Sequence, residues 1–153
     1  MEHTVSPQSR ATYSRQGGRL LDLCMVDNSH SVASASSDGT VHVRKETMPS
    51  GRSRAGGNTP RVCGSSMVRC VAPGEGAVVS VHHFNTELGS PLVYGTRKGG
   101  VRSWDLRARE EPWALRVHPE LGFLTAISLG TEKNWLVVGT SRGFVMLWDL
   151  RFQ

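Results

Sequence analysis

The chain has 153 residues, the length of one ordinary domain, and a formal net charge of +5. Only 7% of its residues are aromatic, while 17 are glycine and 7 are proline. This composition excludes a simple helical bundle and favours an all-β chain of short strands joined by tight turns. The sequence contains neither an apolar stretch long enough to span a bilayer nor the apolar core of a secretory signal, so we expect an intracellular, cytoplasmic protein.

The N-terminal residues 1–18 are polar and basic, and we expect them to form a disordered tail. A second basic stretch, residues 45–60, combines Gly, Ser and Pro with basic side chains and is expected to be a flexible insertion. Both stretches are most simply explained as solvated chain, because neither has the interleaved aromatic side chains that stack on bases. A basic surface for RNA or anionic lipids stays open as an alternative.

The first predicted unit covers about residues 19–72. An apolar strand is expected at 19–26, followed by "HSVASASSDGTVHVRK" at 30–45, which has the pattern of strand, tight turn and strand. Asp38 and Gly39 form the predicted turn. Cys24 lies in an apolar run, where a buried thiol is the usual outcome. The odd cysteine count, without metal-ligand spacing, predicts free thiols at three positions: Cys24, Cys63 and Cys70.

Two further units follow, at about 77–118 and 123–153. In the second unit, a strand at 77–84 precedes "PLVYGTRKGGVRSWDLR", and residues 111–118 are expected to add an edge strand. In the third unit, a strand at 123–129 precedes "NWLVVGTSRGFVMLWDLR". The two long segments align with a single extra residue, and each again predicts strand, turn and strand.

A period of 44 residues separates Trp104 from Trp148, and the same period separates Gly99 from Gly143. Glycine suits these turns because a tight hairpin requires positive φ, which glycine adopts at little cost. In the first unit, Arg44 stands where the later units have tryptophan. Four strands in about 44 residues make one blade of a propeller, so we predict a partial β-propeller of about three four-stranded antiparallel blades.

The repeated glycine, valine and Trp-Asp pattern resembles the WD40 repeat. The resemblance implies that the tryptophan closes the third strand and packs between blades, and that the aspartate accepts backbone N–H groups in the next turn. Lys98 and Arg142 depart from the family, which often has aspartate in the hairpin turn, and His118 is the one candidate for its usual Gly-His histidine. The predicted structural repeat positions are Asp38, Gly39, Gly99, Trp104, Asp105, Gly143, Trp148 and Asp149.

Over residues 19–153 the finer pattern, including "VVSVHHFNTELGSPLVYG", is similar to the C-terminal propeller of the large regulatory subunits of class III phosphatidylinositol 3-kinase. The resemblance implies a non-catalytic scaffold or regulatory module that acts by protein–protein binding in autophagy and in endosomal and vacuolar or lysosomal protein sorting. The implied partners are the lipid kinase catalytic subunit and a Beclin-type subunit. The resemblance also implies peripheral association with endosomal and autophagosomal membranes through the complex. An unrelated WD40 adaptor is the alternative within the same fold.

Catalytic chemistry is not expected, because the kinase-like domain of the parent family has no counterpart in these residues and the "GEGAVV" segment at 74–79 lacks the third glycine of a kinase loop. Adjacent strand residues point to opposite faces, so His82 and His83 are expected to be structural rather than a metal pair. We predict no catalytic residue, metal, cofactor or nucleic-acid partner. Arg107 and Arg151 follow the repeat aspartates at equal offsets and are candidates for partner contacts, with solvated or salt-bridged arginine as the alternative.

Three blades are fewer than the four to eight that close a propeller. We therefore expect blade faces that lack a neighbour, and exposed apolar faces of this kind favour association.

Overall fold

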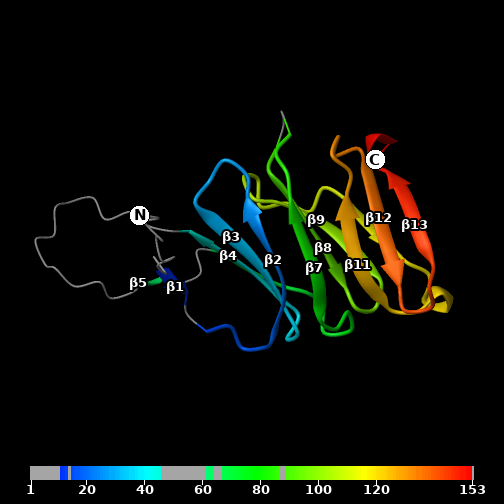
Figure 1. Cartoon of the computed structure of the whole chain (residues 1–153), viewed down its shortest axis with the longest axis horizontal. Helices are drawn as coiled ribbons and strands as arrows, with labels where there is room; N and C mark the ends of the chain where they lie inside the picture. Colours follow the sequence, from blue (N-terminus) through cyan, green and yellow to red (C-terminus); the bar gives the residue numbers. More distant parts are fainter. Residues whose placement is uncertain (1–10, 14, 46–60, 64–66, 87–88, 153) are drawn as a thin grey trace, which may run out of the picture.

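Three antiparallel sheets stand side by side in the computed structural model, which describes residues 11–13, 15–45, 61–63, 67–86 and 89–152 (Figure 1). This arrangement confirms the all-β partial propeller. Helical structure is confined to two single turns of 3-10 helix, η1 (Pro119–Leu121) and η2 (Leu150–Phe152), within the described ranges. None of the described helices is long and apolar enough to cross a membrane.

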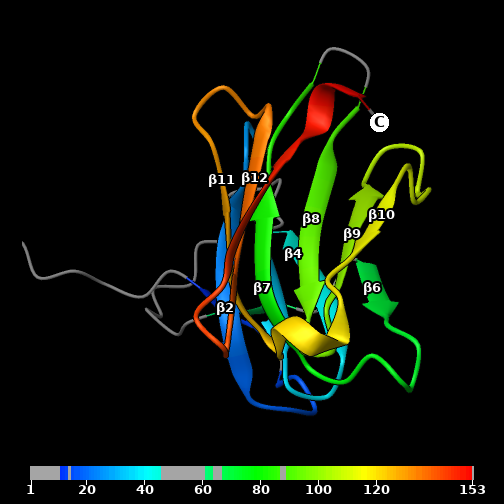
Figure 2. The ribbon, with the colours of Figure 1, turned by 90° about the vertical axis from the view of Figure 1, so that its right-hand side faces the viewer.

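The strands of each sheet pair in chain order, and the first strands of the three sheets, β2, β7 and β11, lie on the same side of the stack (Figure 2). The first sheet consists of β2 (Leu20–Val26), β3 (Ser31–Ser36), β4 (Thr40–Lys45) and β6 (Met67–Cys70). The second consists of β7 (Val78–His83), β8 (Pro91–Thr96), β9 (Gly100–Asp105) and β10 (Ala114–Arg116). The third has three described strands, β11 (Leu124–Leu129), β12 (Trp135–Thr140) and β13 (Val145–Asp149).

The predicted glycine turns connect the second and third strands of every sheet. Gly39, Gly99 and Gly143 have φ values of 80°, 91° and 82°, which lie in the region that disfavours residues with a Cβ atom. The N–H of each glycine donates to a carbonyl three residues earlier, at 3.0 to 3.2 Å. Local turn chemistry therefore aligns the strand pairs of all three sheets in the same register.

Strand pairing places Arg44, Trp104 and Trp148 at one equivalent position, as the sequence alignment predicted. They pair with Val32, Leu92 and Leu136, respectively. Residues at equivalent positions of the three sheets can therefore be compared directly. Differences in their burial then report which neighbouring sheet or segment packs against them.

Two apolar clusters fill the spaces between neighbouring sheets. Val81, Tyr94 and Trp104 of the second sheet pack against the first sheet. Leu124 and Ile127 of the third sheet pack in the other cluster, which also holds residues of the second sheet. Burial of these side chains supplies the main driving force for stacking the sheets.

The N-terminal prediction is wrong for residues 11–13 and for Gln16. The short strand β1 (Ala11–Tyr13) pairs in parallel with β5 (Arg61–Cys63), and Gln16 is buried against the first sheet. Gln16 Nε2 donates to Thr40 Oγ1 at 2.9 Å, so a contact distant in sequence orders a segment whose composition is polar. Residues 1–10 lie outside the described residues, as do residues 46–60 of the predicted insertion, while Lys45 ends β4.

Candidate interaction site

The repeat aspartates cap the turns that follow the third strands. Asp105 Oδ1 accepts hydrogen bonds from the backbone N–H groups of Arg107 at 2.7 Å and Ala108 at 3.1 Å. Asp149 Oδ1 accepts one from the N–H of Arg151 at 3.0 Å. Partial burial opposes ionisation of Asp105, but its backbone donors outweigh that effect and hold its pKa below the ordinary value. These contacts agree with the turn-capping role that the resemblance implied.

The two predicted arginine contacts have different surroundings. The Arg151 guanidinium binds the Asp149 carboxylate at 2.5 Å and lies over the Trp135 ring, 5.6 Å from its centroid. Arg107 is exposed, and it is its backbone N–H that contacts Asp105. Arg151 is thus salt-bridged, as the structural alternative expected, whereas Arg107 presents its guanidinium at the surface.

A pocket of about 410 Å³ lies where the second and third sheets meet, at the end of the molecule that carries both WDLR segments. Asp105 from the second sheet and Arg151 from the third both line it, so the fold brings these two predicted positions together. Its other lining residues are mainly apolar, with the single basic residue Lys133, and include Phe84, Pro91, Trp113 and Leu150. Aromatic and apolar walls with a few polar groups suit a side chain from a partner protein.

Ser103 gives this pocket an unusual polar group. The residue is fully buried, and its Oγ has no hydrogen-bond partner among the described residues. A buried unpaired hydroxyl is costly, so Ser103 makes this part of the sheet junction less stable than an apolar residue would. The sequence did not indicate Ser103, because the equivalent positions carry the apolar residues Val43 and Leu147.

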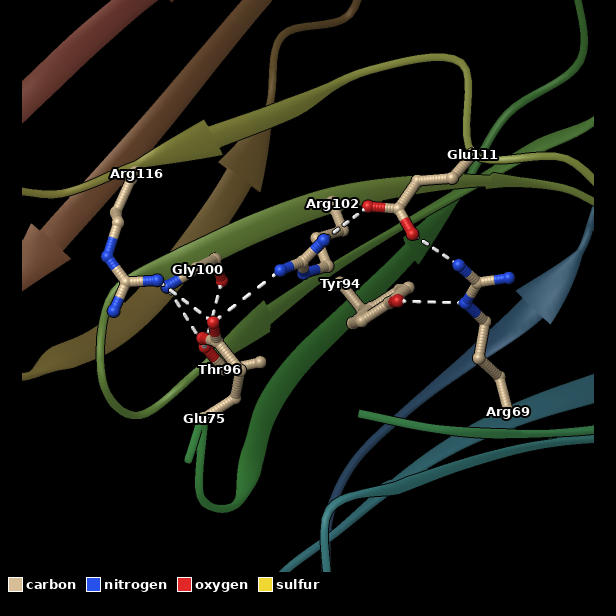
Figure 3. Close-up of polar contacts among 8 residues, drawn as sticks. All are labelled: Arg69, Glu75, Tyr94, Thr96, Gly100, Arg102, Glu111 and Arg116. Carbon is tan, nitrogen blue, oxygen red and sulfur yellow. Dashed lines mark hydrogen bonds and ion pairs between the residues drawn. The ribbon is translucent and has the colours of Figure 1, made fainter. Parts of the chain in front are cut away.

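A charged network joins the first two sheets at their outer strands (Figure 3). Glu75, almost fully buried, accepts a hydrogen bond from Thr96 Oγ1 at 2.8 Å, and its Oε1 lies 2.9 Å from Arg116 Nη1 and 3.5 Å from Arg102 Nη2. Burial alone would raise the pKa of Glu75, but the Thr96 and Arg116 hydrogen bonds and the nearby guanidinium charges lower it overall. The buried carboxylate is therefore stabilised in its charged form.

Glu111 continues the network from the second sheet to the first. One of its oxygens lies 2.5 Å from Arg102 Nη1, and the other pairs with Arg69 of β6. Arg69 Nε also donates to the Tyr94 hydroxyl at 3.1 Å, as Figure 3 shows. Sequence reasoning missed this network, because its members are spread over residues 69–116 without a motif. Several charges held together contribute more than isolated surface pairs.

In the first sheet, a polar cluster replaces the tryptophan of the repeat. Arg44 is buried, and its guanidinium donates to Ser34 Oγ and, at 3.1 Å, to Gln16 Oε1. Ser34 Oγ in turn lies 2.9 Å from Gln16 Oε1. The buried cation is thus held by hydrogen bonds, and it lies over the Tyr13 ring, 6.0 Å from the ring centroid, so the N-terminal segment supplies both Gln16 and Tyr13 as partners.

The adjacent histidines contact opposite neighbours, in agreement with their predicted directions. His82 Nε2 lies 2.8 Å from the carbonyl oxygen of Ile127 in the third sheet. His83 Nδ1 accepts a hydrogen bond from the Asp27 N–H at 2.9 Å, and its Nε2 lies 2.8 Å from Ser90 Oγ. In the described part of the chain, no group of three or more His, Cys, Asp or Glu side chains gathers in a way that could hold a metal ion.

The fold and the repeat geometry place the chain among WD40 β-propellers. The crystal structure of the C-terminal WD40 domain of Sif2 matches it with a TM-score of 0.68 and 18% identity, over 92% of this chain and 34% of that one. No protein-family model matches the sequence.

The sequence further resembles two proteins named VPS15. It is 38% identical, over 99% of its length, to a probable serine/threonine-protein kinase vps15 of Dictyostelium discoideum, and 34% identical, over 100% of its length, to serine/threonine-protein kinase VPS15 of Arabidopsis thaliana. The chain spans only 8% and 10% of these relatives. Along almost its whole length the chain is therefore similar to part of these VPS15 proteins, and its fold is that of WD40 domains, which supports a regulatory or scaffold role.

Proposed function

We propose that the chain is a scaffold segment of the class III phosphatidylinositol 3-kinase complex and acts by binding other proteins. The observation that carries this proposal is the similarity to VPS15 proteins along almost the whole chain, on a WD40 fold. Rigid sheets hold short loops in fixed positions, so the loop side chains determine which partner binds. The partners in this proposal are the lipid kinase catalytic subunit and a Beclin-type subunit, and the complex brings the chain to endosomal and autophagosomal membranes.

The pocket between the second and third sheets is the contact site that we favour. Its apolar walls, including Trp113, can bury a partner side chain. Lys133 lies in the lining, and Arg107 is exposed in the loop that follows Asp105. These cations favour a partner segment that carries acidic residues beside an apolar anchor.

Affinity purification of the tagged chain from cell lysate at moderate salt tests the proposal. The folded chain should recover both the lipid kinase catalytic subunit and the Beclin-type subunit. Arg107→Glu should reduce recovery severalfold, because it reverses an exposed charge beside the pocket. Lys98→Glu is the matched control, since Lys98 is exposed in the glycine turn of the same sheet. Recovery of neither subunit by a chain shown to be folded would overturn the proposal.

The alternative of a basic surface for RNA or anionic lipids has less support from the described residues. Arg69, Arg102, Arg116 and Arg151 are engaged with carboxylates. Phosphate binding requires cations that are available to replace counterions, and it weakens steeply as salt rises. Capture of the two protein subunits that persists at moderate salt would favour the scaffold function over this alternative.

A further inference from the structure

A closed cycle of hydrogen bonds links the first sheet to the second. The Asp27 N–H donates to His83 Nδ1 at 2.9 Å, and because a backbone amide can only donate, the neutral imidazole carries its proton on Nε2. Nε2 therefore donates to Ser90 Oγ at 2.8 Å, and this hydroxyl donates to Asn85 Oδ1 at 3.0 Å. Asn85 Nδ2 donates to the Asp27 carbonyl oxygen at 3.1 Å and closes the cycle. We call Asp27, His83, Asn85 and Ser90 the His83 network.

The His83 network accepts only one protonation state of the imidazole. The side chain of His83 is fully buried, and the partly exposed Asp27 carboxylate lies 3.9 Å from Nδ1. A proton on Nδ1 would remove the acceptor of the Asp27 N–H and would attract the Asp27 carboxylate in its place. Protonation therefore exchanges a backbone partner for a side-chain partner, which requires the turn after β2 to move.

The His83 network also holds one wall of the pocket between the second and third sheets. Asn85 and Ser90 lie between residues that line this wall, which are Phe84, Thr86, Gly89 and Pro91. The Ser90 carbonyl oxygen accepts a hydrogen bond from the Leu106 N–H at 3.0 Å. The backbone N–H of Ser90 is one of the donors that lower the pKa of Asp105, which also lines the pocket. A displacement of Ser90 therefore reaches both the pocket wall and the turn that Asp105 caps.

Charged groups from three turns face His83. Burial has the largest effect on the imidazole and disfavours its charged form, while Asp27 in the turn after β2 favours that form. Lys133 in the turn after β11 and Arg107 in the turn after β9 oppose it, so the pKa of His83 lies below 6.5. The His83 network is therefore closed above the folded midpoint of His83 and is expected to open as the pH falls through it.

We propose that His83 is a pH-dependent switch for the pocket: the neutral imidazole holds the wall formed by Phe84, Gly89 and Pro91 in its binding geometry, and the protonated imidazole releases it. This inference rests on the proposed function, because it concerns how binding at that same pocket is controlled. Neither His83 nor Asn85 lines the pocket, so both are positioning residues. Partner binding should weaken as the pH falls, and by linkage a bound partner should keep His83 neutral to a lower pH.

Washes of decreasing pH test the switch. The lipid kinase catalytic subunit and the Beclin-type subunit are captured on the tagged chain at about pH 7.5 and then washed at constant ionic strength down to about pH 5. Their retention should fall about threefold or more, with a midpoint that matches the His83 titration measured by nuclear magnetic resonance. His83→Gln carries a neutral amide and should make retention nearly independent of pH. His118→Gln is the matched control, since His118 is exposed, and should keep the native dependence.

A second variant opens the His83 network without removing the histidine. Asn85→Ala should lower retention severalfold already at neutral pH, because Ser90 loses the acceptor that orients its hydroxyl. Amide hydrogen exchange of the free chain gives a measurement that needs no partner. The protection factors of the Asp27 and Leu106 N–H groups should fall below the His83 midpoint in the native chain but not in His83→Gln. Far-ultraviolet circular dichroism establishes that each variant is folded.

The outcomes separate the switch from the proposed function. Retention that stays constant while His83 titrates would overturn the switch and leave the proposed function standing. Stronger retention at low pH would also overturn the switch, because acidic groups of the partner would then favour protonated His83 through charge. Failure to capture either subunit at neutral pH would overturn the proposed function itself, and the switch with it.

Discussion

Asp22 holds the first sheet to Ser80 of the second across 58 residues of sequence. One carboxylate oxygen accepts hydrogen bonds from the Ser80 hydroxyl at 2.8 Å and from the N–H of Val81 at 2.9 Å. The contact joins β2 to β7, the first strands of the two sheets, beside the apolar cluster that fills the junction. It therefore adds a directional polar bond to apolar packing that is not directional.

Replacement of Asp22 by alanine is expected to lower the free energy of unfolding by about 2–3 kcal/mol, because a buried hydroxyl and an N–H group both lose their acceptor. Asp22→Asn should cost less, since its amide oxygen still accepts. Urea unfolding measures both effects. Glu132→Ala, at an exposed position, is the control and should leave the midpoint unchanged within error. An equally small effect of Asp22→Ala would show that the two hydrogen bonds do not stabilise the sheet junction.

Acid should weaken the network around Glu75. Its pKa lies below the ordinary 4.5, because hydrogen bonds from Thr96 and Arg116 outweigh the effect of burial. A lowered carboxyl pKa gives stability that is present above the unfolded value and is lost as the pH falls through the folded value. Stability of the native chain should therefore decrease below about pH 4.5 more steeply than that of Glu75→Gln. Urea midpoints measured against pH test this, and Glu132→Gln should follow the native curve.

His83 should make a second contribution to the pH dependence. Burial lowers its pKa from 6.5, and Lys133 and Arg107 lower it further, although Asp27 acts in the opposite direction. The neutral ring is also required by geometry, because Nδ1 accepts the Asp27 N–H and protonation would remove that acceptor. The stability contribution is present above about pH 6.5 and is lost as the pH falls through the lower folded value.

Nuclear magnetic resonance titration of the His83 ring measures this prediction directly. The folded chain should show a His83 midpoint below that of the urea-unfolded chain. Lys133→Gln removes a positive charge that lowers the pKa of His83, so this variant should raise the folded midpoint slightly. Val26→Ala and Asp27→Ala are not suitable controls, because they alter the surroundings of the ring. A folded midpoint at or above the unfolded one would contradict the assigned hydrogen-bonding pattern.

The described thiols should differ in reactivity. Burial, with Asp22 and Asp27 nearby, raises the pKa of Cys24 to about 12, whereas Cys70 is exposed. Thiolate is the reactive form, so iodoacetamide at about pH 8 should modify Cys70 of the folded chain well before Cys24. Peptide mapping by mass spectrometry measures the order, and urea should remove the protection of Cys24. Equal rates in the folded chain would contradict the burial of Cys24. The side chain of Cys63 lies outside the described residues.

Local chemistry made much of the fold predictable from the sequence. The turn glycines adopt positive φ and the repeat aspartates bond to the turns that follow them, so Gly99 was identified from the 44-residue period, and the role of Asp105 from the WD40 resemblance. The pocket and the charged network were not predictable in this way. Gln16 was assigned to a disordered tail because its neighbours are polar, and its order depends on Thr40 and Arg44, which a distant segment supplies.

The sequence by itself determined the hairpin strands, their glycine turns and their common register, because those depend on alternation and on residues close together in the chain. It did not indicate β1, β5 or β6, whose pairing partners are distant in the chain. Only the tertiary structure decided which faces are buried. Val41, Val101 and Val145 have the same place in the repeat, but only Val145 is exposed. The physical reason is that burial depends on a neighbouring sheet, and the first and second sheets each have one on that side, whereas the third does not.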